Sequence, residues 1–162
     1  MAAIVVGSVL ALAPAAQAET TTVESNETVP VATTRDNPCT GETVVLSGTY
    51  HVQAKTTVTT DLTGTRFHSH ELEKLSLRGT ALVTGAVYQN QEQQTSEQNW
   101  SLDPLGGLAP YESTSQATML LIRQGEIKSP PDDFWTRLVA HLTYNANGVM
   151  TVQRAELSFD CR

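Results

Sequence analysis

Apolar and polar residues alternate with a period of two along much of the chain, and no other feature limits the fold as strongly. Between residues 44 and 53, the side chains of Val44, Leu46, Tyr50 and Val52 recur at this spacing. A β-strand directs successive side chains to opposite faces, so the pattern is typical of a strand with one buried face. Threonine, which favours extended backbone because it is β-branched, occurs 23 times. The chain is therefore predicted to be all-β.

Residues that form turns separate the predicted strands. Asp103–Pro110 and Asn145–Gly148 are rich in glycine, proline and asparagine, which adopt the backbone angles that turns require. We predict one continuous strand over 79–89, with a bulge at Gly85, and a polar hairpin tip over 90–97. In total the pattern predicts seven to nine strands.

A chain of 162 residues provides one domain. Consecutive strands joined by turns predict an antiparallel, up-and-down β-barrel, because closure removes exposed strand edges. A β-sandwich is the alternative. The likeness to calycins is an analogy of fold only, because Gly48-Thr49-Tyr50 stands where a lipocalin has Gly-x-Trp.

The N-terminal residues 1–18 have the pattern of a secretory signal peptide. They carry no charged side chain and end in Ala16-Gln17-Ala18, a small-x-small cleavage signal. Residues 19–38 lack periodicity and aromatic side chains, which predicts a flexible leader, and residues 39–162 form the predicted domain. We expect an exported bacterial protein, extracellular or periplasmic, with no membrane span after cleavage.

Cys39 and Cys161 are the two cysteines of the chain. In an oxidising compartment an even number of cysteines predicts a disulfide. This bond joins the start of the predicted domain to its end, and so favours closure of the sheet.

The net charge of −7, from 10 basic and 17 acidic residues, argues against nucleic acid as a partner. Phosphate recognition requires a basic surface, and so does attraction to anionic lipids.

Motifs near both ends carry a resemblance. Asn37-Pro38-Cys39-Thr40-Gly41-Glu42 precedes the first alternating strand, and a strand ending in Cys161-Arg162 follows the turn at Asn145–Gly148. At these two ends the chain resembles small uncharacterised secreted bacterial proteins. The resemblance implies an all-β fold and a disulfide, and it implies no reaction.

His68 and His70 are the candidate metal ligands. Residues two apart on a strand point to the same side, so both imidazoles would reach one ion. His51 or His141 would supply a third ligand if the strands lay alongside. Glu71 and Glu73 have the opposite parity, which weakens a metal site; exposed polar residues on a strand are the alternative.

Four aromatic residues are the candidate ligand-binding side chains: Tyr88, Trp100, Tyr111 and Trp135. Aromatic side chains near loops stack on sugars or anchor interfaces. The alternative is that they pack over one end of the sheet.

No motif identifies a reaction or a cofactor. The chain has no Gly-x-Ser-x-Gly elbow and no phosphate-binding glycine loop. We therefore expect a non-catalytic protein that binds a small apolar ligand, or an extracellular protein or glycan. The alternatives are a metal-binding protein or metal-dependent enzyme using His68 and His70, and an interaction module of the cell envelope with a packed interior.

Overall fold

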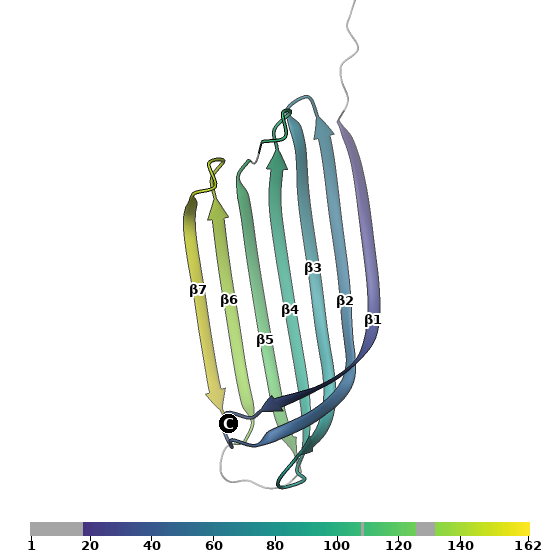
Figure 1. Ribbon diagram of the computed structural model, residues 1–162, viewed down its shortest axis with the longest axis vertical. Helices are drawn as coiled ribbons and strands as arrows, with labels where there is room; N and C mark the ends of the chain where they lie inside the picture. The colour runs from purple at the N-terminus through teal and green to yellow at the C-terminus, as the bar shows by residue number, and fades with distance from the viewer. Residues whose placement is uncertain (1–17, 108, 126–131) are drawn as a thin grey trace, which may run out of the picture.

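The computed structural model describes residues 18–107, 109–125 and 132–162. They form seven antiparallel strands in one sheet, in which each strand pairs with the next along the chain (Figure 1). The strands are β1 (Glu19–Asp36), β2 (Thr43–Asp61), β3 (Gly64–Ala81), β4 (Val87–Leu102), β5 (Tyr111–Gln124), β6 (Phe134–Tyr144) and β7 (Met150–Cys161). The described part of the chain has no helix that is long and apolar enough to cross a membrane. The predicted all-β, antiparallel architecture is confirmed.

The register of the sheet sorts the side chains into two faces. Leu46 is paired with Gly79, Gly79 with Tyr88, and Asn90 with Leu121. Directly paired residues point to the same side of a sheet, so these residues share one face, which we call the inner face. The alternate residues form the outer face, where polar side chains predominate, threonine and glutamine above all. The period of two in the sequence thus corresponds to side chains that alternate between these two faces.

The hydrophobic core lies at one end of the inner face, the lower end in Figure 1. There, the end of β1 and the start of β2 cross over the sheet towards β6 and β7. The side chains between these layers make up the core: Val44, Leu46, Leu77, Ala81, Tyr88, Leu121 and Phe134. The core therefore depends on the fold-over of the first two strands.

Two glycines lie where β2 and β3 approach each other most closely. A Cβ atom at Gly79 would overlap the backbone oxygen of Val45, and one at Gly48 would overlap that of Ser76. Neither site tolerates a side chain without a shift of the backbone. Gly79 thus allows the close contact of the two strands at the folded end.

The turn between β1 and β2 is bonded to residues beside β6 and in β7, at the opposite edge of the sheet, and so holds the fold-over in place. Asn37 is fully buried and donates a hydrogen bond from Nδ2 to the backbone oxygen of Asp132 (2.7 Å), while its Oδ1 accepts one from the Cys39 N–H (2.9 Å). Cys39 forms the disulfide with Cys161, with a Cα–Cα distance of 5.7 Å. We call Asn37, Cys39 and their partners Asp132 and Cys161 the latch. The predicted disulfide is present.

Glu19–Asp36 is strand β1, paired with β2 along its whole length. The prediction that residues 19–38 form a flexible leader is therefore wrong for this segment. Its backbone is held by the ladder to β2, although most of its side chains are exposed. The predicted signal peptide, residues 1–18, lies outside the described residues except for Ala18.

Two strand boundaries differ from those predicted. Residues 79–89 are the end of β3, a turn and the start of β4, and Gly85 is in the turn with a φ of 69°. Residues 90–97 lie within β4 and are not a hairpin tip. The prediction was wrong because this segment is polar on both faces. Half of its residues face solvent on the outer face, and polar residues also lie on the inner face here.

The sheet is not closed into a barrel. β1 and β7 are its two edges, and within the described residues the latch joins them at the lower end. Ala155, Leu157 and Phe159 are on the inner face, and they are exposed because β7 is an edge strand with no sheet partner beyond it. The choice between barrel and sandwich stays a prediction.

Candidate functional site

An apolar groove lies on the inner face directly above the core. Its volume is about 290 Å³, and strands β2 to β7 contribute to it. The inner-face side chains that line it are Tyr50, Glu73, Leu75, Glu92, Gln94, Ala117, Met119, Thr136, Leu138 and Leu157. Since Leu75 and Met119 also pack against the core, the groove continues the apolar interior into a space that solvent reaches.

An ion pair joins the folded-over end of β1 to a strand that lines the groove. Arg35 on β1 reaches across the fold-over to Glu92 on β4, with an Nη2–Oε1 distance of 2.6 Å. Both side chains are about two-thirds buried, with 34% and 26% of their surface exposed. Because the pair joins strands that are not neighbours in the sheet, it helps to hold the fold-over in place.

The polar groups of the groove are acidic or neutral. Glu73 lies beside Tyr50, and burial together with the hydrogen bond to Glu73 raises the pKa of the Tyr50 hydroxyl. Glu92 is paired with Arg35. Among the residues lining the groove there is no cation, so its polar end does not favour an anionic group.

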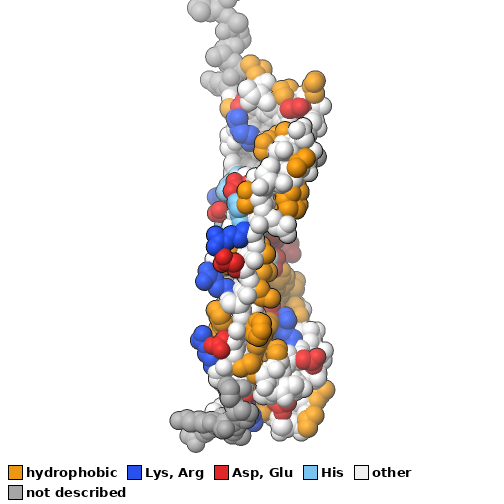
Figure 2. All heavy atoms as spheres, turned by 90° about the vertical axis from the view of Figure 1, so that its left-hand side faces the viewer, with side chains coloured by type: hydrophobic (Ala, Val, Ile, Leu, Met, Phe, Trp, Pro, Cys, Tyr) orange, Lys and Arg blue, Asp and Glu red, His pale blue; other side chains and the backbone are white. Residues whose placement is uncertain are grey.

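Exposed apolar side chains form the rim of the groove on the β7 side. Leu138 is 38% exposed, Leu157 67% and Phe159 72%. Figure 2, which looks onto the β7 edge, shows hydrophobic side chains along this edge and charged and histidine side chains gathered to its left. The inner face is thus apolar up to the edge of the sheet.

The four aromatic residues predicted to bind ligand are distributed over three places. Tyr88 is fully buried in the core and donates a hydrogen bond to Glu42 Oε2 (3.0 Å); its burial and this carboxylate raise the pKa of the hydroxyl. Trp135 is on the outer face, where the Arg162 guanidinium lies 5.4 Å from its ring centroid. Neither residue lines the groove.

Trp100 and Tyr111 lie together at the other end of the inner face. Trp100 stacks on Phe67 with a centroid distance of 4.9 Å, and Tyr111 lies 6.0 Å from Tyr144. These four half-buried rings form an aromatic row across β3 to β6. Trp100 and Tyr111 therefore lie at the end of the inner face opposite the core, and neither lines the groove.

His68 and His70 point to the outer face of β3, and Glu71 and Glu73 to the inner face. His68 Nδ1 lies 2.7 Å from Asn99 Oδ1. His51 is opposite Lys74, four residues from the partner of His70, which corresponds to about 13 Å along the strand. Within the described ranges no three metal-binding side chains come together, so the structure gives the histidine pair no third ligand.

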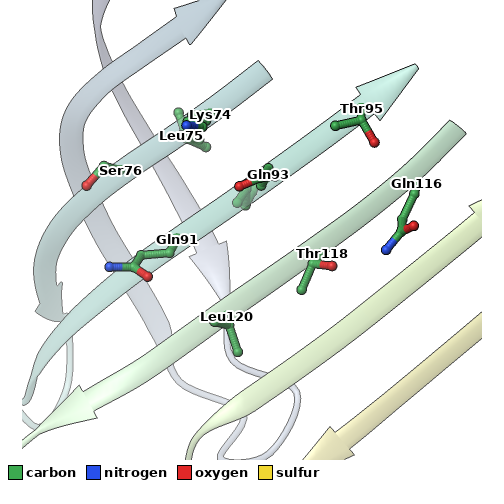
Figure 3. A pocket seen from close by; sticks show the side chains of 10 residues that line it. Lys74, Leu75, Ser76, Gln91, Gln93, Thr95, Gln116, Thr118 and Leu120 are labelled. Carbon is green, nitrogen blue, oxygen red and sulfur yellow. The ribbon is translucent and has the colours of Figure 1, made fainter. Parts of the chain in front are cut away.

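A larger hollow, about 690 Å³, opens on the outer face of β3, β4 and β5. Lys74, Ser76, Gln91, Gln116 and Thr118 are among the side chains around it (Figure 3). These groups are polar and exposed to water, so a ligand in this hollow would bury little apolar surface. The inner groove is smaller but apolar, and burial of apolar surface is what drives the binding of small molecules.

Comparison with known protein families, with curated proteins and with solved structures finds no significant match to this chain. The site is therefore interpreted from its geometry alone.

Sequence reasoning missed the groove and the Arg35–Glu92 pair. The alternation correctly assigned Tyr50 and Leu138 to the apolar faces of their strands. It did not indicate which strands lie opposite each other, so no signal in the sequence brought these side chains together. Asn37 and Glu42 were noticed only as parts of a motif, although both make contacts between distant strands.

Proposed function

We propose that the chain is a non-catalytic binding protein that takes a small apolar ligand into the groove on its inner face. The observation that carries this proposal is the groove itself, an open apolar space of about 290 Å³ above a packed core. A binding site of this kind needs concave apolar surface and few polar groups. The exposed Leu138 and Leu157 beside it give a ligand further apolar contact.

The acidic polar groups of the groove define the class of ligand. Glu73 would repel a carboxylate or phosphate in this partly buried site, and the charge of Glu92 is already balanced by Arg35. The preferred ligand is therefore a neutral or cationic amphiphile, such as a long-chain alcohol or amine, rather than a fatty acid.

We also propose that the protein works outside the cytoplasm. The disulfide between Cys39 and Cys161 supports this, because such bonds persist in oxidising compartments. Strand β1 begins at Glu19, the residue that follows the expected cleavage site. Export would thus leave the whole sheet intact.

The test is a fluorescence titration of the exported protein with phenylnaphthylamine, a neutral apolar probe. We expect saturable binding with one probe per chain. Dodecylamine and dodecanol should displace the probe, and lauric acid should displace it poorly. Native mass spectrometry of protein purified without denaturant will show whether an apolar molecule copurifies.

The groove is tested with Leu138→Gln, and the matched control is Val139→Gln on the opposite face of the same strand. We expect the first change to weaken probe binding about tenfold, because about 1.4 kcal/mol of apolar contact is lost. The control should bind as the unmodified protein does. Absence of saturable binding, or equal loss in both variants, would show that the groove is not a ligand site.

A further inference from the structure

Strand β7 is an exposed edge that nothing in the described chain covers. All twelve of its residues are exposed, including the apolar Val152, Leu157 and Phe159. On an edge strand, the backbone N–H and C=O groups that point away from the sheet are free to pair with another strand. Natural sheets protect such edges with proline, lysine or a bulge. The segment 150–161 contains neither proline nor lysine, and the register shift of the β6–β7 ladder lies at the start of β7, opposite Thr143 and Tyr144.

The free backbone groups of β7 belong to its odd-numbered residues. Arg162 and Asp133 exchange both backbone hydrogen bonds, at 2.9 and 3.0 Å, so the polar groups of Arg162 face β6. The direction alternates along a strand, and the β6–β7 register is regular from Phe134 to Thr143. The N–H and C=O groups of Ala155, Leu157 and Phe159 therefore point away from the sheet.

The other edge, β1, is protected. Asn37 donates its N–H to Glu42, so odd residues of β1 face β2 and even residues face outward. Pro30 is therefore at an outward position, where the missing N–H interrupts any further ladder. The two edges differ, and β7 is the one built to accept a strand.

The sequence of β7 is complementary to itself in one antiparallel register. With Leu157 opposite Leu157 of a second copy, Ala155 lies opposite Phe159 and Arg154 opposite Asp160. Ala155 is small and leaves room for the Phe159 ring. Because the two copies are related by symmetry, the pair of Arg154 and Asp160 occurs twice. Moving the register by two residues in either direction instead places acidic side chains opposite each other: Glu156 opposite Asp160, or Glu156 opposite Glu156.

We propose that two copies of the chain pair through β7 in this register and form a continuous sheet of fourteen strands. A two-fold axis perpendicular to the sheet keeps the inner faces of both copies on the same side. Leu157, now exposed, then lies against Leu157 of the second copy, and Phe159 lies against Ala155 of the second copy. Since Leu157 also lines the groove, the second copy completes the rim. The pairing does not depend on a ligand.

The first measurement is the mass of the exported protein by sedimentation velocity at increasing concentration. We expect a species of twice the chain mass and none larger, because a two-fold contact closes on itself. A monomer at all concentrations would overturn the proposal. A series of larger species would also overturn it, since that indicates β7 pairing with β1 of the next copy.

Two proline variants then locate the contact. Leu157→Pro removes an outward N–H from β7, and Asn26→Pro removes an outward N–H from β1; neither N–H belongs to the sheet of the single chain. We expect the first variant to be a monomer with an unchanged circular dichroism spectrum, and the second to remain a dimer. A dimer that survives Leu157→Pro, or is lost in both, contradicts pairing through β7.

The register is tested by exchanging charges. In a single copy, Arg154 pairs with Glu156 on its own strand, with an Nε–Oε1 distance of 2.9 Å. Arg154→Asp would place carboxylates opposite each other at two places in the dimer, and should weaken association at least tenfold. The double variant Arg154→Asp/Asp160→Arg should restore it, whereas a double variant as weak as the single one would exclude this register.

Discussion

At the scale of single residues, the motif around Asn37 has a structural explanation. Asn37 connects β1 to the start of β6, Cys39 forms the disulfide, and Glu42 accepts the hydrogen bond of the buried Tyr88. These residues therefore join segments that are 46 to 122 positions apart. The motif that resembles the secreted bacterial proteins accounts for how the fold closes at its lower end, and it is not part of the groove.

We predict that Asn37→Ala lowers the free energy of unfolding by about 2–3 kcal/mol. The change leaves the Asp132 carbonyl and the Cys39 N–H without their side-chain partner in a buried site, and an unpaired buried group costs about 1–3 kcal/mol. Urea unfolding measures the loss. The exposed Asn26→Ala is the control and should change stability by no more than about 0.5 kcal/mol; equal effects would contradict the role of the latch.

At the scale of elements, glycine allows β2 and β3 to lie close together at the folded end of the sheet. Gly79 is opposite Leu46 in the register, and the β2 backbone occupies the space that a Cβ atom would need. The alternating pattern predicted strands over 44–53 and 79–89, so both residues were expected in strands. The sequence pattern did not predict the fold-over of these strands, because tertiary packing decides the register between them.

Gly79→Ala is predicted to destabilise the protein by about 1–3 kcal/mol, the usual cost of overpacking. The added methyl group meets backbone, which cannot rotate away. Thr80→Ala, at the exposed neighbouring position on the outer face, serves as the control. A thermal or urea midpoint that is unchanged in Gly79→Ala would show that the strands separate easily at this point.

At the scale of the whole molecule, the disulfide closes a sheet that hydrogen bonding leaves open. Cys39 and Cys161 are 122 residues apart, and β1 and β7 share no ladder. The bond therefore holds the folded end of the sheet together, and it also limits the conformations of the unfolded chain.

We predict that the paired change Cys39→Ser and Cys161→Ser costs about 2–4 kcal/mol in the free energy of unfolding. In the folded protein, hydrogen exchange should increase at the end of β1 and the start of β6, which the latch joins. The centres of β3 and β4, paired on both sides, should keep their protection. Uniform loss of protection across all strands would mean that the disulfide supports the sheet as a whole.

The sequence by itself determined the class of secondary structure, the faces of the strands and the disulfide. These depend on local alternation, on turn residues and on the presence of two cysteines, all of which are readable along the chain. Only the tertiary structure decided that residues 19–36 are a strand, because a polar segment gains its order from the ladder to β2. The groove and the open β7 edge were likewise decided there, since the pairing of strands and the fold-over depend on contacts between residues far apart in the sequence.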